Sequence, residues 1–285
     1  MEPKYKLIGI DIDGTLTNSR GEISARTKTA IHRVAEIGAQ VVVATGRRFF
    51  TARPKVLPLD FPDLLLAVHN GAILKRLNGE VIYHDLLPRE IAQQTVALAK
   101  TLGLCPIIFE GTQHAANILV EDYGDRIDAW QRGYLEENRE HLRWVRDLAT
   151  DVPGDVIEVI CVVPAAQVHE IVRAFQEQLD GQVKPILVIV NNGQQAFVGL
   201  SNAVVGKHRP LEYLAAQMGL ERAEILAIGD NYNDLDMLQY AGTGVIMANA
   251  DVSLKIMGFH ETETNDADGV AVALENLVLG GTYVA

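Results

Sequence analysis

Three short apolar runs constrain the fold of this chain more than any other feature. They are KLIGI (residues 6–10), VVVAT (41–45) and LLLAV (64–68), and none of them alternates apolar with polar residues. Strands of this kind are buried on both faces, as in a parallel sheet covered by helices. Between the first two runs, Ser24 is a candidate helix N-cap, and apolar residues recur at helical spacing until Gly38. The pattern predicts an α/β fold.

The segments after the third run have a different character. Asn78-Gly79 lies between two strand-like stretches and predicts a β-hairpin with a type I′ turn. Farther on, strands occur in pairs between helices, and we expect a polar helical stretch through Trp130 and Trp144, with both tryptophans in the core. Pairs of strands between helices are typical of an α+β unit rather than of further parallel layers.

Parallel-sheet character returns in the last third of the chain, where EILAIGD (residues 224–230) is predicted to be a strand followed by a helix. The third part of the chain therefore continues the sheet that the first part begins. We predict a discontinuous parallel-sheet core, residues 1–84 and 199–285, with an inserted α+β cap at residues 85–198.

Composition and charge limit the possible partners. The formal net charge is -12 over 285 residues, which argues against nucleic acid as a bulk partner because phosphate binding needs clustered Lys and Arg. Cys105 and Cys161 lie far apart in apolar segments, which predicts buried thiols in a reducing compartment. The sequence has neither a signal-peptide pattern nor an apolar run near the ~18–20 residues that cross a bilayer. We expect a cytoplasmic protein that does not bind a membrane.

Polar residues follow the predicted core strands, at the ends where ligands collect in an open parallel sheet. In chain order they are Asp11 and Asp13, then Thr45 and Gly46, then Asn70, and finally Asp230, Asn233 and Asp234. Crowded carboxylates favour a hard cation with oxygen ligands. Mg²⁺ fits best, because it takes few carboxylates and is completed by water and substrate phosphate.

The residue types suggest a division of roles in phosphoryl transfer. Asp11 is the candidate nucleophile, and Asp13 is the candidate general acid and base. The Thr45 hydroxyl and the Gly46 N–H, near the start of a following helix, are candidate donors to a phosphoryl group. Lys207 begins the helix after the insertion and is the candidate that neutralises charge on the nucleophile and the transferring group.

These residues resemble a known family. DIDGT, TGR, Lys207 and GDNYND occur in that order across the chain. The pattern is similar to that of the haloacid dehalogenase-like hydrolases, and in particular to Cof-type sugar-phosphate phosphatases with a C2-type cap. The resemblance implies a Rossmann-like core and a magnesium-dependent phosphatase. Its implied substrate is a small phosphorylated metabolite, most readily a sugar phosphate, hydrolysed through an aspartyl-phosphate intermediate.

The resemblance also implies a role for each motif residue. The expected Mg²⁺ ligands are Asp11, Asp230 and the backbone carbonyl of Asp13. The expected contacts to the phosphoryl group are Thr45, Gly46, Lys207 and Asn233. Asp234 is expected to support the metal site or Lys207 without contacting the reacting atoms. Asn70 is grouped with Asp234 as a supporting residue, although a turn residue and a substrate contact are equally open interpretations of it.

Several neighbouring residues are interpreted as structural. Gly206-Lys207-His208 stands where the family usually has Ser-Lys-Gly, a difference that removes no charged catalytic group. His208 is expected to be structural and Asp236 to be a helix-start charge. Arg47 is interpreted as an ordinary surface charge.

Two other functions fit the same residues. A phosphomutase or phosphotransferase would form the same intermediate and differ only in the acceptor. A non-enzymatic, magnesium-dependent phosphoacceptor or binding protein would also gather acids at strand ends, but the large insertion would then have no purpose. Release of free phosphate without an added acceptor would distinguish a hydrolase from the first alternative. A long-lived aspartyl phosphate without turnover would favour the second alternative.

Overall fold

The computed structural model describes residues 3–111 and 117–280 of the chain. The chain divides into two compact units. The core unit comprises residues 1–83 and 206–285, and the inserted unit comprises residues 84–205. Within the described ranges, every helix is too short or too polar to span a bilayer.

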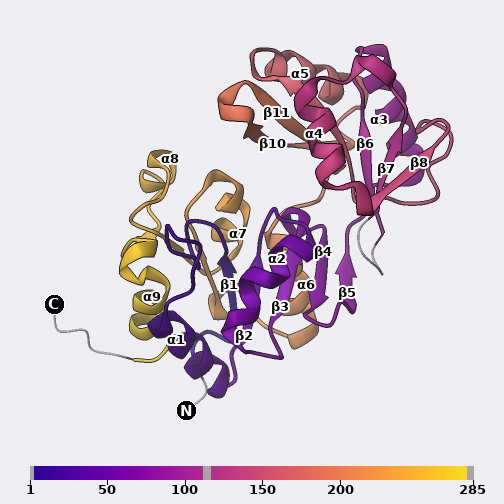
Figure 1. The fold of residues 1–285 in the computed structure, drawn as a ribbon. Coiled ribbons are helices and arrows are strands. Elements are labelled where there is room, and N and C mark those ends of the chain that lie inside the picture. The colour runs from indigo at the N-terminus through magenta and orange to yellow at the C-terminus, as the bar shows by residue number, and fades with distance from the viewer. Residues whose placement is uncertain (1–2, 112–116, 281–285) are drawn as a thin grey trace. The chain divides into compact units, whose positions relative to one another are not determined.

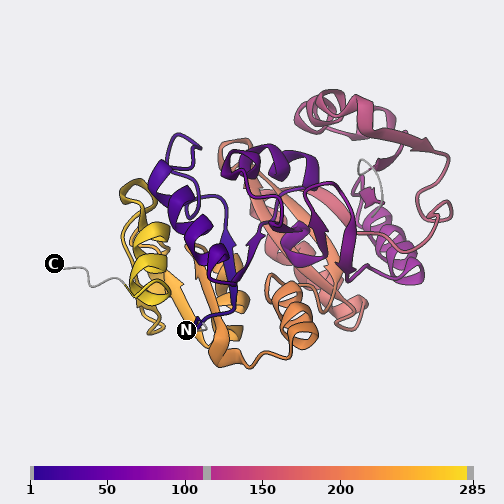
Figure 2. The ribbon, with the colours of Figure 1, turned by 90° about the horizontal axis from the view of Figure 1, so that it is seen from below.

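The core unit is built on a sheet of eight strands, counted over the described residues, in the order β14-β13-β12-β1-β2-β3-β4-β5 (Figure 1). The strands are β1 (Leu7–Asp11), β2 (Gln40–Ala44), β3 (Leu65–Val68), β4 (Ile73–Arg76), β5 (Val81–His84), β12 (Ile225–Gly229), β13 (Thr243–Ile246) and β14 (His260–Glu261). Neighbouring strands from β14 to β3 are parallel, and β4 is antiparallel to β3. Strand β1 therefore lies between an early strand, β2, and a late strand, β12, as Figure 2 also shows.

Helices cover both faces of this sheet. They are α1 (Ala25–Glu36), α2 (Phe49–Val56), α6 (His208–Met218), α7 (Leu235–Tyr240), α8 (Val252–Lys255) and α9 (Gly269–Leu277). Helices α6 and α7 pack against the face that carries Leu7 and Ala227. Helices α1 and α9 lie side by side, joined by Arg26 and Glu275 (Figure 1). All residues of β1 and β12 are buried, which confirms the predicted α/β class and parallel core.

Local sequence signals set the ends of the first helix. Ser24 has an extended backbone, and its Oγ accepts a hydrogen bond from the Thr27 N–H at 3.1 Å. The predicted N-cap is therefore present. The helix ends at Glu36, two residues before Gly38, where the prediction placed its end.

The hairpin predicted at Asn78-Gly79 joins β4 and β5, but the predicted type I′ turn is wrong. A type I′ turn needs a positive φ at both central residues. Gly79 has a φ of 95°, whereas Asn78 does not have a positive φ. The Gly79 N–H donates to the Arg76 carbonyl, and the Arg76 N–H donates to the Glu80 carbonyl, both at 2.9 Å. These bonds close a three-residue loop that ends in one left-handed glycine.

The inserted unit is an α+β domain. Its sheet has six strands among the described residues, in the order β10-β11-β9-β6-β7-β8. The strands are β6 (Ile107–Glu110), β7 (Asn117–Glu121), β8 (Leu142–Val145), β9 (Glu158–Pro164), β10 (Val183–Val190) and β11 (Gln195–Asn202), and the helices are α3 (Arg89–Thr101), α4 (Ala129–Glu137) and α5 (Val168–Gln178). Val96 of α3 and Phe175 of α5 pack with Ile108 of the sheet in a continuous apolar core.

This unit differs from expectation at two places. Strand β11 was not predicted, and it runs across residue 198, where the insertion was expected to end. The predicted polar helix stops at Glu137, and Trp144 lies in the edge strand β8 with 58% of its surface exposed. Trp144 is therefore outside the core. Cys105 and Cys161 are buried free thiols, as expected.

Candidate active site

The predicted site residues lie at the carboxyl-end edge of the core sheet. Asp11 is the last residue of β1, Thr45 directly follows β2, and Asp230 directly follows β12. Because β1 is hydrogen-bonded to both β2 and β12, three segments that are distant in the sequence meet at this edge. Open α/β sheets bind their ligands at such a point, where the strand order reverses.

Lys207 lies between two carboxylates. Its Nζ donates to Asp11 Oδ1 at 2.6 Å and to Asp234 Oδ1 at 2.5 Å, and all three side chains are buried. Lys207 is the N-cap residue of α6, and Asp234 is the N-cap residue of α7. Burial alone would lower the pKa of Lys207, but the carboxylates of Asp11 and Asp234 outweigh this effect and raise that pKa. The ammonium is therefore a fixed positive charge beside Asp11.

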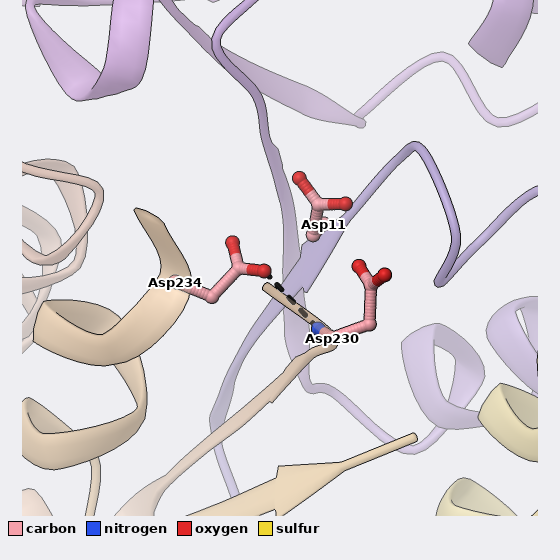
Figure 3. A group of neighbouring side chains, drawn as sticks. All are labelled: Asp11, Asp230 and Asp234. Carbon is pink, nitrogen blue, oxygen red and sulfur yellow. Dashed lines mark hydrogen bonds between the residues drawn. The ribbon is translucent and has the colours of Figure 1, made fainter. Parts of the chain in front are cut away.

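Asp230 brings a third carboxylate to the same place. One oxygen from each of Asp11, Asp230 and Asp234 lies within 4.8 Å of the other two (Figure 3). Thr15 Oγ1 donates to Asp230 Oδ1 at 2.9 Å. Gly14 has a φ of 83°, and a Cβ there would collide with the Asp230 carboxylate. A glycine is therefore needed for the loop after β1 to pass so close to Asp230.

The cluster carries more negative charge than Lys207 neutralises. One ammonium faces three carboxylates, so two negative charges remain when all of them are ionised. Burial raises the pKa of Asp11 to about 8, with the charge of Asp234 adding to the effect and Lys207 opposing it. Burial likewise raises the pKa of Asp230 to about 6. A divalent cation has the charge that this cluster lacks.

The remaining oxygen atoms fit a hard divalent cation. Asp234 is fully engaged, because Oδ1 faces Lys207 while Oδ2 accepts from the N–H groups of Asp230 and Asn231 at 3.1 and 3.0 Å. By contrast, the second carboxylate oxygens of Asp11 and Asp230 accept no hydrogen bond from any other residue that the structure describes. Asp11 and Asp230 are therefore the side chains that could hold Mg²⁺, and Asp234 supports both Lys207 and the Asp230 backbone.

Asp13 lies outside this cluster. Its carboxylate accepts hydrogen bonds from Arg47 Nε at 2.5 Å and from Arg47 Nη2 at 2.8 Å, and both side chains are partly exposed. This bidentate contact raises the pKa of Arg47. Arg47 is therefore a residue of the site and not the surface charge expected from the sequence. The position of Arg47 directly after Thr45-Gly46 is the one sequence signal for this role.

The predicted phosphate contacts lie next to one another. The buried Thr45 accepts a hydrogen bond from the Arg47 N–H at its Oγ1 (3.2 Å), and its carbonyl accepts one from the Asn70 N–H at 3.0 Å. Gly46 lies against the Asn70 amide. Asn233 Nδ2 approaches Asn70 Oδ1 at 3.5 Å. Asn70 thereby links the loops after β2 and β12.

Comparison with known proteins places this geometry in a family. Residues 8–274 match the family model described as haloacid dehalogenase-like hydrolase. Phosphatase YwpJ of Bacillus subtilis (strain 168) is 27% identical to the chain, over 96% of the chain and 100% of its own length. The 5-amino-6-(5-phospho-D-ribitylamino)uracil phosphatase YwtE of the same organism is 28% identical, over 96% of the chain and 99% of its own length.

A solved structure agrees with these relatives. The crystal structure of a haloacid dehalogenase-like hydrolase from Bacteroides thetaiotaomicron matches with a TM-score of 0.75 and 31% identity, covering 96% of this chain and 99% of its own. The family expected from DIDGT, TGR, Lys207 and GDNYND is therefore confirmed. The chain belongs to the haloacid dehalogenase-like hydrolases, and among them to the phosphatases.

Proposed function

We propose that this phosphatase hydrolyses phosphomonoesters of small metabolites, with Mg²⁺ as its cofactor and Asp11 as its nucleophile. The observation that carries the proposal is the buried cluster in which Lys207 lies between Asp11 and Asp234, beside Asp230. Its two uncompensated charges suit a divalent cation. Asp11, Asp230 and the Asp13 carbonyl would hold Mg²⁺, which would supply charge neutralisation for the phosphoryl oxygens.

In the first step, a carboxylate oxygen of Asp11 attacks phosphorus and the bond from phosphorus to the ester oxygen breaks. The leaving oxygen takes a proton from Asp13, so that a neutral alcohol departs. Lys207 offsets the negative charge of Asp11 and of the phosphoryl group as they approach each other. Thr45, Gly46 and Asn233 orient that group, as the family resemblance implies.

In the second step, water attacks the aspartyl phosphate and restores the Asp11 carboxylate. Asp13 takes a proton from this water. The Asp13 carboxylate accepts two hydrogen bonds from Arg47, and this bidentate contact orients it. We therefore assign Arg47 to positioning Asp13.

The substrate class is proposed from the relatives. The substrate in the name of YwtE carries its phosphate on a ribityl chain, which is a phosphorylated polyol. Sugar and polyol phosphates are therefore the first candidates for this chain. We propose, from the family resemblance, that the inserted unit recognises the leaving group.

The test is a screen of phosphate release across phosphorylated metabolites, with Asp11→Asn as the blank. We expect release by the wild type with Mg²⁺, none after chelation with EDTA, and none from Asp11→Asn. Release of phosphate without an added acceptor supports a hydrolase, whereas product formed only with a second sugar phosphate supports a phosphotransferase. Turnover by Asp11→Asn would refute the assigned nucleophile, and a stable phosphoprotein without turnover would indicate a phosphoacceptor.

A further inference from the structure

The first residue of α6 makes a side-chain contact that the proposed reaction does not use. His208 Nδ1 lies 3.3 Å from Asp236 Oδ2, and the two side chains are 28% and 27% exposed. The His208 ring also packs 6.1 Å from the ring of Tyr240, measured between centroids. Asp236 and Tyr240 are one turn apart on α7, so His208 docks on one face of that helix.

Gly206 leaves the space in which this contact forms. A Cβ at Gly206 would lie 2.5 Å from His208 Nδ1 and would also collide with the Asp236 carboxylate. Real Cβ atoms do not tolerate such contacts. Any side chain at this position must therefore displace both the His208 ring and the Asp236 carboxylate, or move the backbone at Lys207.

The His208–Asp236 contact joins the same two segments as the catalytic ion pair. Lys207–Asp234 and His208–Asp236 both connect the start of α6 to the start of α7. Asp11 lies on neither segment, and Lys207 must reach it at 2.6 Å while keeping Asp234 at 2.5 Å. A lysine side chain has four flexible bonds, so its ammonium keeps this position only if its backbone is held.

We infer that His208 and Asp236 are positioning residues, which together with Gly206 hold the backbone of Lys207 so that its ammonium lies between Asp11 and Asp234. The inference rests on the proposed function, in which Lys207 acts on the transferring phosphoryl group. It assigns a role to two residues that the sequence suggested were structural.

The experiment measures hydrolysis of p-nitrophenyl phosphate with Mg²⁺ by Gly206→Ala, His208→Ala and the double variant. Gly206→Ala should lower kcat strongly, because a displacement of about 1 Å in a catalytic group costs on the order of 10²-fold. His208→Ala should lower kcat several-fold and change KM less. The double variant should have a higher kcat than Gly206→Ala, since removal of the imidazole relieves one of the two collisions of the new methyl group and leaves the Asp236 carboxylate room to turn away from it.

Two further variants separate positioning from folding. His208→Asn should recover most of the kcat lost in His208→Ala, because its amide can donate to Asp236 from near the position of Nδ1. His260→Ala, at an exposed histidine of the same unit, should leave kcat unchanged. Thermal unfolding of each variant shows whether it is folded, and a lower kcat with an unchanged midpoint supports positioning.

The outcomes distinguish this inference from the proposed function. If the wild type hydrolyses no phosphomonoester, the proposed function fails and the inference fails with it. If the wild type is active but Gly206→Ala and His208→Ala keep full kcat, only the inference is overturned. The inference is also overturned if the fold-losses in kcat of Gly206→Ala and His208→Ala simply multiply in the double variant. It is overturned as well if His208→Asn is as slow as His208→Ala.

Discussion

Two lysines of this protein each lie between two carboxylates, one in each unit. In the inserted unit, Lys100 Nζ donates to Glu121 and Asp147, both at 2.5 Å. The distances match those at Lys207, but the surroundings do not. The side chain of Lys207 is fully buried, whereas that of Lys100 is 23% exposed and that of its partner Asp147 is 40% exposed. The same arrangement of charges therefore occurs once in partial contact with water and once away from it.

The pKa directions show what burial changes. The hydrogen bond from Lys100 lowers the pKa of Asp147, which is the ordinary effect of an ion pair. Burial raises the pKa of Asp11 despite an equally close ammonium. Loss of hydration therefore outweighs attraction in the core unit but not in the inserted unit. The ion pairs of the carboxylate cluster in the core unit are therefore unfavourable on balance. The same cluster is the one suited to binding a cation and to catalysis.

The largest expected difference is between Lys207→Met and Lys100→Met. Lys207→Met should lower turnover on the order of 10³-fold or more, because it removes charge stabilisation at the reacting group. It should also cost roughly 3 kcal/mol of unfolding free energy, since two buried carboxylates lose their partner. Lys100→Met should keep turnover and cost about 1 kcal/mol or less. Phosphate release and urea unfolding of both variants test this prediction. Equal losses of unfolding free energy in the two variants would contradict the difference drawn between the two lysines.

A second difference concerns how the stability of the wild type and of Asp11→Asn depends on pH, measured in EDTA so that no metal is bound. Because the pKa of Asp11 is raised in the folded state to about 8, its contribution to stability is present below its ordinary value of 3.8 and is lost as the pH rises toward 8. Asp11→Asn cannot ionise. The thermal midpoint of this variant should therefore rise relative to that of the wild type as the pH rises. Each ~1 kcal/mol of difference in unfolding free energy corresponds to a few degrees of midpoint. Parallel stability profiles of the two proteins would contradict the assigned charge excess.

A third difference concerns the metal. Protons and Mg²⁺ compete for Asp11 and Asp230, whose pKa values are about 8 and about 6. The rise in thermal midpoint on adding Mg²⁺ should therefore be larger at about pH 8 than at about pH 5.5. Asp230→Asn should abolish the rise, whereas Asp147→Asn should keep it. A rise that is independent of pH would argue against these ligands.

The smallest expected effect is that of Asp147→Asn alone. Since its pKa is lowered in the folded state, Asp147 contributes stability above its ordinary value of 3.8, and this is lost as the pH falls below that value. The loss near pH 7 should be below about 1 kcal/mol, because the pair is screened by water. Urea unfolding near pH 7 and pH 3 checks both the size and the sign.

The parts of the fold that could be predicted are those in which local sequence and burial agree. Apart from Asp11 at the end of β1, the residues of β1 and β12 are uncharged and buried, which is the pattern of strands in a parallel sheet covered on both faces. Asp11, Lys207 and Asp230 could be selected because strand ends converge in such a sheet. Strand β11 escapes prediction because Gly199 interrupts its short apolar run, and polar residues (Gln195, Ser201 and Asn202) form its two ends.

The contacts that escaped prediction depend on pairing across the fold. Nothing near Arg47 in the sequence indicates that its partner is Asp13, which lies on another loop of the sheet edge. His208 and Asp236 look like an ordinary histidine and an ordinary helix-start acid until α6 and α7 are packed together. Residue types at strand ends therefore predict the chemistry, while the partners that hold those residues require the tertiary structure.

The position of β1 between β2 and β12 has a consequence for synthesis on the ribosome. Strand β2 emerges soon after β1, but β12 follows only after the whole inserted unit has been translated. Until then one edge of β1 lacks its neighbour, and Asp11 remains hydrated and away from Lys207 and Asp230. The nascent chain therefore carries no assembled centre, and a product truncated before β12 should be inert and exposed to aggregation along that open edge.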